Sequence, residues 1–152
     1  MRLSSPTFTD GESIPEKHGY DTENTNPPLR IEDVPASAAS LALVVDDPDA
    51  QEPAGKIWDH WVVWNVVPDI ARIETGSTPP GATEGENDFG EIGYGGPNPP
   101  DQEHIYYFRL YALDTKLYLD AGASKEELHE AMETQIVDET ELLGTYAPNR
   151  PN

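Results

Sequence analysis

The chain has 152 residues, no cysteine and a formal net charge of -20, from 29 acidic and 9 basic residues. This length suits one hydrophobic core, and we expect a single domain over residues 1–152. Without cysteine, disulfides, thiolate nucleophiles and cysteine-ligated zinc sites are excluded. A field of this sign repels phosphate backbones, so we expect no nucleic-acid partner.

The apolar runs of the chain indicate a folded protein, although acidic chains of this kind are sometimes disordered. A folded, acidic chain with only four lysines is typical of a cytoplasm rich in salt, where ionic strength screens self-repulsion. We therefore expect a protein of a halophilic archaeon; an ordinary acidic mesophilic protein is the alternative. The N-terminus lacks the apolar segment of a secretory signal and no run approaches a membrane span, so we expect a cytoplasmic location.

Three apolar runs, at 40–45, 60–67 and 104–113, predict β-strands bounded by proline, glycine or acidic residues. Because side chains alternate along a strand, the second and third runs each have one predicted face that begins with a histidine. These faces comprise His60, Val62, Trp64 and Val66, and then His104, Tyr106, Phe108, Leu110 and Ala112. Both faces of these runs are apolar, so we expect them to be central and covered on both sides. Shorter strands are predicted at 3–8, 28–31 and 70–74.

One helix is predicted near 124–137. Ser124 and Glu127 form a capping-box pattern, and apolar residues follow at helical spacing up to Ile136. A second short helical turn is predicted at 138–143. The stretch 76–101 is rich in glycine, proline and asparagine and predicts a long loop, a kind of segment that often carries function.

Three polar residues, Asp47, His60 and His104, are predicted to meet at one edge of the sheet. If the first two strands pair antiparallel, Asp47 and His60 lie at the same edge, and His104 reaches it if its strand runs in the direction of the second. Trp58, Tyr106 and the glycine- and proline-rich loop would supply apolar walls. A few polar groups in an apolar lining are typical of a small-ligand pocket.

A histidine beside a carboxylate has a raised pKa, so two such histidines could donate hydrogen bonds to an anion. Backbone amides of the turn at Gly95 and Gly96 could assist. The alternatives are that the histidines are structural strand-end residues, or that two histidines and a carboxylate bind a transition metal. Asp88-Phe89-Gly90 spells a kinase motif without its companion motifs, so we interpret it as coincidence. We expect His18 and His129 to be solvated.

Several segments of the chain together carry a resemblance to a known family. They are Tyr20–Leu29 (YDTENTNPPL), Asp47-Pro48-Asp49-Ala50, Trp58-Asp59-His60-Trp61, Gly96-Pro97-Asn98-Pro99-Pro100, His104-Ile105-Tyr106, Leu110–Asp114 (LYALD) and Gly144-Thr145-Tyr146. In their order and spacing they resemble the phosphatidylethanolamine-binding protein (PEBP) family, in its prokaryotic YbhB/YbcL-like branch, which is also called Raf kinase inhibitor-like.

The resemblance implies a mainly β fold, in which a large antiparallel sheet packs with a smaller one beside a few peripheral helices. It implies a non-enzymatic binding protein without cofactor or metal, with a pocket for phosphate-type anions or phosphorylated head groups. The alternative is a kinase or protease inhibitor, or a scaffold, that acts through protein contacts; a homodimer is also implied. The pocket residues implied by the resemblance are Asp47, Trp58, His60, Gly96, Pro97, His104 and Tyr106.

The chain departs from the family pattern near the expected pocket. Gln51 replaces a proline, and Ile105 replaces an arginine that follows the histidine. Ile105 should point away from His104, because neighbouring side chains of a strand face opposite sides. Asp101 and Glu103 add two acids beside the pocket mouth. These changes disfavour tight binding of an anion.

Overall fold

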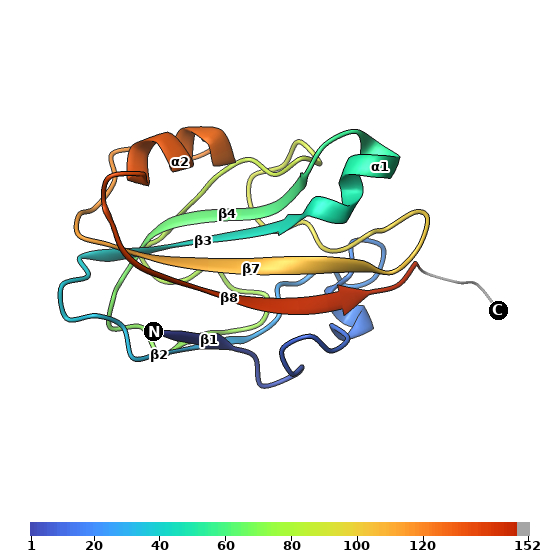
Figure 1. Ribbon diagram of the computed structural model, residues 1–152, viewed down its shortest axis with the longest axis horizontal. Coiled ribbons are helices and arrows are strands. Elements are labelled where there is room, and N and C mark those ends of the chain that lie inside the picture. Colours follow the sequence, from blue (N-terminus) through green and yellow to red (C-terminus); the bar gives the residue numbers. More distant parts are fainter. Residues whose placement is uncertain (149–152) are drawn as a thin grey trace.

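The computed structural model describes residues 1–148 and consists of two antiparallel sheets and a few short helices (Figure 1). The larger sheet has the order β6 (Thr83–Glu84), β4 (Trp58–Val66), β3 (Ser40–Asp47), β7 (His104–Leu113) and β8 (Ile136–Tyr146). The smaller sheet has the order β1 (Arg2–Ser4), β2 (Leu29–Glu32) and β5 (Arg72–Ile73). The predicted mainly β fold with a large and a small sheet is therefore confirmed. The shorter strand predictions correspond to the small sheet.

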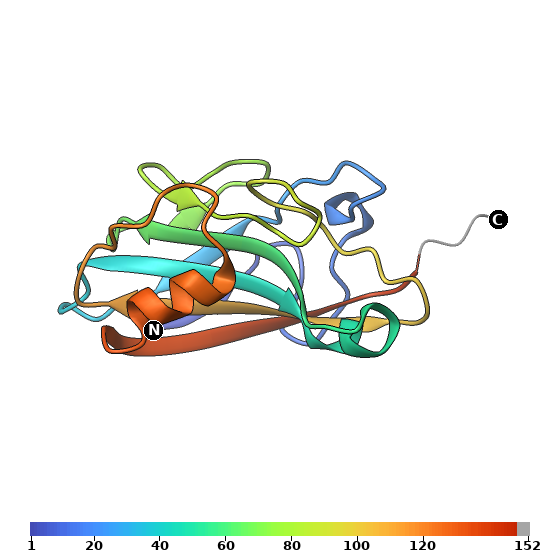
Figure 2. The same cartoon turned by 90° about the horizontal axis from the view of Figure 1, so that it is seen from above.

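Two apolar cores lie on the two faces of the large sheet. The small sheet covers one face and the helix α2 (Lys125–Met132) covers the other (Figures 1 and 2). Alternate residues of β3 enter the two cores, so that Leu43 faces the small sheet and Val44 faces α2. Every residue of β3 is buried, which explains why this strand is a continuous apolar run.

In β4, the alternate side chains from His60 to Val66 do not all lie on the same face of the sheet, contrary to the prediction. Its register against β3 shifts between the pairs Val45–Trp61 and Asp46–Asp59, so His60 is the extra residue of a bulge. The His60 ring lies 5.2 Å from the ring of Tyr106, on the small-sheet side.

Beyond the bulge, Val62 and Trp64 pack in the core under α2. A second register shift lies near Asn65, which has a positive φ of 57°, a conformation that asparagine tolerates. This shift returns Val66 to the other core. Simple alternation predicts that His60, Val62, Trp64 and Val66 share one face. Because of the two bulges, His60 and Val66 lie on the small-sheet side, and Val62 and Trp64 lie on the α2 side.

Strand β7 has one buried face, as predicted, but its other face is only partly covered. His104, Tyr106 and Phe108 are buried, whereas Ile105 is 39% exposed. The expectation that this strand is covered on both sides was therefore wrong, because α2 packs over β3, β4 and the end of β7 at Leu113 and leaves the part of β7 near Ile105 uncovered.

Helix α2 begins where it was predicted to begin, but it ends before the predicted C-terminal residue. The side chain of Ser124 accepts a hydrogen bond from the Glu127 amide, and the Glu127 side chain accepts one from the Ser124 amide. The helix stops at Met132 and the chain enters β8, so the predicted helix to 137 and the helical turn at 138–143 were wrong. β8 pairs with the whole length of β7, and this long-range pairing overrides the helical spacing before it.

The N-terminus of α2 is anchored to the large sheet by a buried lysine. Lys125 is 9% exposed, and its ammonium lies 2.6 Å from a carboxylate oxygen of Asp59 and 3.8 Å from one of Asp46. Burial raises the pKa of Asp59 to about 6, although Lys125 opposes the shift. This pairing lies at the same end of β3 and β4 as Asp47 and His60.

Short helical turns complete the chain: η1 (Glu16–His18), η2 (Pro48–Ala50) and α1 (Gln51–Ala54). His18 is fully buried and its Nδ1 hydrogen-bonds the Thr25 carbonyl, so the expectation that it is solvated was wrong. His129 packs edge-on against Tyr111 but is exposed, as expected. Within residues 1–148, no helix is long and apolar enough to cross a membrane.

Candidate functional site

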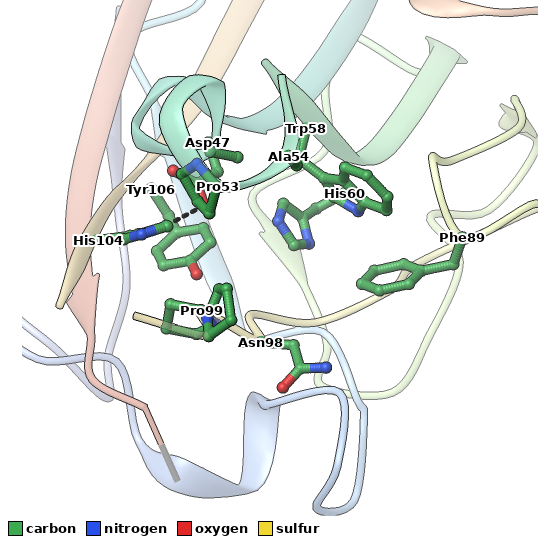
Figure 3. A pocket seen from close by; sticks show the side chains of 12 residues that line it. Asp47, Pro53, Ala54, Trp58, His60, Phe89, Asn98, Pro99, His104 and Tyr106 are labelled. Atoms are coloured by element: carbon green, nitrogen blue, oxygen red, sulfur yellow. Dashed lines mark hydrogen bonds and ion pairs between the residues drawn. The ribbon is translucent and has the colours of Figure 1, made fainter. Parts of the chain in front are cut away.

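A cavity of about 220 Å³ lies at the end of the large sheet where β3 stops and β4 and β7 begin (Figure 3). Antiparallel pairing of β3 with both neighbours brings these three strand ends together. Most of the wall is apolar. The lining residues are Asp47, Ala50, Pro53, Ala54, Trp58, His60, Phe89, Asn98, Pro99, Pro100, His104 and Tyr106.

The structure brings five of the seven predicted pocket residues to this cavity, and Gly96 and Pro97 are not among them. The Gly96 amide donates to Asn24 at 2.8 Å, and a side chain at Gly96 would meet the carbonyl of His18. The Pro97 carbonyl accepts a hydrogen bond from the Tyr20 amide at 2.9 Å. These two residues therefore hold their loop against the N-terminal segment, and the next three residues, 98–100, form the wall.

Sequence reasoning expected the glycine- and proline-rich loop before β7 in the wall, but it missed the parts that come from η2, α1 and Phe89. Phe89 stacks on Tyr20 at 3.9 Å between ring centroids and lies edge-on to Trp58 at 5.5 Å and to His60 at 5.7 Å. The Asp88-Phe89-Gly90 segment, interpreted as a coincidence, thus supplies an aromatic wall. The available signal was that Phe89 is, with Tyr94, one of two aromatic residues in the glycine-rich stretch 76–101.

Asp88 holds Phe89 in place through contacts with the start of β4. Its carboxylate accepts hydrogen bonds from the Asp59 amide at 2.6 Å and from Lys56 at 2.8 Å. The Asp88 amide in turn donates to the Asp59 carbonyl at 2.9 Å. The loop that carries Phe89 is therefore tied directly to the strand that carries His60.

His104 is buried between two carboxylates. Its Nδ1 lies 2.6 Å from Asp47 Oδ2, and its Nε2 lies 2.7 Å from Asp101 Oδ1 (Figure 3 shows the first pair). Burial opposes the charged ring, but the two carboxylates outweigh burial and raise the pKa of His104 above its ordinary value. Both ring N–H groups then donate, as they do in an imidazolium.

His60 is in the opposite state. Its Nδ1 lies 2.7 Å from the Gly95 carbonyl and donates to it, because a carbonyl oxygen only accepts. Burial lowers the pKa of His60 to about 4, although this hydrogen bond opposes the shift. The ring is therefore neutral near pH 7 and Nε2 is an acceptor. The expectation that both histidines gain a carboxylate and a raised pKa holds for His104 and was wrong for His60.

Three buried polar atoms of lining residues have no hydrogen-bond partner within residues 1–148: Asp47 Oδ1, Trp58 Nε1 and Tyr106 Oη. Each unpaired buried group costs about 1–3 kcal/mol. A bound group that paired with them after a small adjustment would recover part of that cost. In the described chain, residues 1–148, no group of three or more metal-ligating side chains is arranged to hold a metal ion.

Comparison with known proteins identifies the family of this chain. The model of the phosphatidylethanolamine-binding protein family matches residues 4–147. The chain belongs to the PEBP family. It is 47% identical over 151 residues to a UPF0098 protein of Methanothermobacter thermautotrophicus, covering 96% of this chain and 98% of that protein. A UPF0098 protein of Chlamydia muridarum is 44% identical, with the same coverage of both chains.

Two solved PEBP structures share the fold. The PEBP homologue CT736 of Chlamydia trachomatis superposes with a TM-score of 0.91 at 42% identity, covering 97% of both chains. Escherichia coli YbcL, described as a new member of the mammalian PEBP family, superposes with a TM-score of 0.89 at 30% identity, covering 98% of both.

Ile105, which stands where the PEBP pattern has an arginine, does not disturb the contacts of His104. The Ile105 side chain is partly exposed on the face opposite to His104, as predicted. Its amide donates to Asp49 Oδ2 at 2.8 Å, which ties the Asp47-Pro48-Asp49 turn to the start of β7. The Asp47–His104 pair therefore does not depend on a cation at position 105.

Proposed function

We propose that this protein is a non-enzymatic PEBP-type binding protein whose cavity takes a phosphate-type anion or a phosphorylated head group. The observation that carries the proposal is the buried His104, whose charged form two carboxylates favour at the wall of an apolar cavity. In a chain of net charge -20, such a positive group is local and depends on this geometry. The two carboxylates balance the charge of His104, so an anion can take a hydrogen bond from the ring only in place of one of them.

The other polar groups of the wall suit a phosphate-type group. Tyr106 and Trp58 carry unpaired donors, and phosphate oxygens accept. His60 Nε2 is an acceptor, and the hydroxyl of a singly protonated phosphate donates. A singly protonated phosphate, which has acceptor oxygens and one hydroxyl, thus matches the donors of Tyr106 and Trp58 and the acceptor of His60. A fully ionised anion has no hydroxyl, so it would match His60 only after His60 took up a proton.

The apolar wall suits the organic part of a head group. Phe89, Trp58 and the prolines of the 98–100 segment offer aromatic and aliphatic surface beside the polar end. A small concave site of this make-up is typical of ligand binding. Both nitrogens of His104 are engaged by carboxylates, which supports binding over general-base catalysis, because neither nitrogen is free to take a proton.

A titration followed by NMR tests the proposal. Inorganic phosphate and phosphoethanolamine should shift the ring signals of His60 and His104 with saturation at millimolar ligand. The exposed His129, which lies on α2 away from the cavity, provides the internal control and should not shift. The absence of a shift in either cavity histidine at millimolar phosphate would contradict the proposal.

A further inference from the structure

The Nε2 donor of His104, a residue that lines the cavity, is already occupied by the chain itself. Asp101 Oδ1 accepts from His104 Nε2 at 2.7 Å, and Pro100, which directly precedes Asp101, lines the cavity together with His104. A carboxylate oxygen therefore sits where an oxygen of a bound anion would accept the same hydrogen bond. We propose that Asp101 is an internal competitor of the ligand, so that an anion reaches His104 only by displacing it. This inference rests on the proposed function and names the residue that controls selectivity at the same site.

The two carboxylates on His104 differ in a way that makes Asp101 the one to leave. The Asp47 side chain is 4% exposed and sits at the end of β3, where the Pro48 turn holds it. The Asp101 side chain is 38% exposed and lies in a bend outside any strand. Asp101 can therefore turn into water and be hydrated there, whereas Asp47 would be left buried and unpaired.

Displacement of Asp101 selects among anions. A carboxylate tethered three residues from His104 has an effective concentration at least in the millimolar range. A free carboxylate offers the same charge and the same oxygens, so it competes only above that concentration. A phosphate-type group brings up to two charges and three acceptor oxygens. Asp101 thus favours phosphate-type over carboxylate-type ligands.

Glu103 provides a matched control in the same segment. It lies two residues from Asp101, is exposed, and makes no hydrogen bond or ion pair with His104 within the described part of the chain. Glu103→Gln removes one negative charge from the segment between Asp101 and His104 without touching the His104 contact. Asp101→Asn removes the same charge together with the charge-assisted bond, and Asp101→Ala removes the acceptor entirely.

The experiment titrates wild type, Asp101→Asn, Asp101→Ala and Glu103→Gln with inorganic phosphate and separately with acetate, followed by the His104 ring signals. Thermal unfolding of each variant shows that it is folded. We expect both Asp101 variants to bind phosphate about tenfold more tightly than wild type, and Glu103→Gln to change less than about twofold. Acetate at millimolar concentration should shift His104 only in the Asp101 variants. Without ligand, the His104 pKa should fall in these variants alone.

The outcomes separate the inference from the proposed function. Equal phosphate affinity in the Asp101 and Glu103 variants would overturn the role of Asp101 and leave the phosphate site standing. No phosphate binding in any of the four proteins would overturn the proposed function and the inference with it. Phosphate binding by the Asp101 variants but not by wild type would support the competition by Asp101 and contradict the proposed function of the wild-type protein.

Discussion

Asp47 and His104 are 57 positions apart in the chain, and their side chains meet at 2.6 Å where the ends of β3 and β7 adjoin. The pair is almost fully buried, with side-chain exposures of 4% and 1%. Buried ion pairs are costly to break, because the remaining partner is left charged and unpaired. The pair therefore links the stability of this sheet edge to the charge state of the cavity.

Asp47→Asn should lower the stability of the protein and should also lower the pKa of His104. The amide keeps the shape of Asp47 but loses the charge, so His104 retains only Asp101 as an anionic partner. We expect the free energy of unfolding to fall by about 2 kcal/mol. Denaturant unfolding and the NMR titration of His104 measure the two effects. Asp69→Asn, at an exposed position, is the control and should leave both unchanged.

His60 should make stability depend on pH in acid. Its pKa is lowered from 6.5 to about 4 on folding, chiefly by burial, so the folded state binds fewer protons than the unfolded state between those values. Stability should therefore rise with pH across this window, by about 3 kcal/mol, and be lost as pH falls through it.

His60→Gln removes this contribution, so the stability of the variant should rise less steeply than that of wild type between about pH 4 and 6.5. Asp59, whose pKa is raised to about 6, contributes the opposite slope in both proteins, so the difference between them isolates His60. Denaturant unfolding at several pH values gives the two profiles. Parallel profiles would show that His60 is not held neutral in the folded state.

Phe89→Ala should weaken the binding of a phosphorylated head group more than that of inorganic phosphate. Phe89 contacts Trp58 and His60 edge-on and forms the wall opposite His104 (Figure 3). Its loss removes apolar surface that only the organic part of a ligand would touch. We expect phosphoethanolamine to bind about fivefold more weakly, with phosphate changed less than about twofold. Tyr118→Ala, at a fully exposed ring, is the control, and an equal loss for both ligands would refute the assignment.

The strands that form the site could be predicted because their signals are local. The run that ends at Asp47 and the run that begins at His104 carry an apolar pattern bounded by turn residues, and antiparallel pairing then brings their ends together. The family motifs identified the same residues. For β3 and β7, the sequence and the structure agree on which side chains face the cavity.

The remaining features depend on contacts that a local pattern does not contain. β8 resembled a continuation of α2 because Ile136 keeps the helical spacing, and only pairing with β7 makes it a strand. The bulge at His60 is a property of its register against β3. The neutral state of His60 depends on the Gly95 carbonyl, which a loop far along the chain brings to it.

The charge of -20 predicts that salt stabilises this protein. At about 1 M salt the Debye length is about 3 Å, so repulsion between separated surface carboxylates is screened. We expect the Tm to rise by about 10 °C or more between about 0.1 and 2 M potassium chloride. Thermal unfolding followed by circular dichroism measures this, and a Tm that stays constant or falls would argue against adaptation to a salt-rich cytoplasm.

A crystal structure of the protein grown or soaked with saturating phosphate tests the central claim most directly. The account predicts a phosphate ion in the cavity between His60 and His104, one oxygen within hydrogen-bond distance of His104 Nε2, and the Asp101 side chain turned into solvent. An empty cavity, with Asp101 still bound to His104 Nε2, would contradict the claim that this site binds a phosphate-type anion.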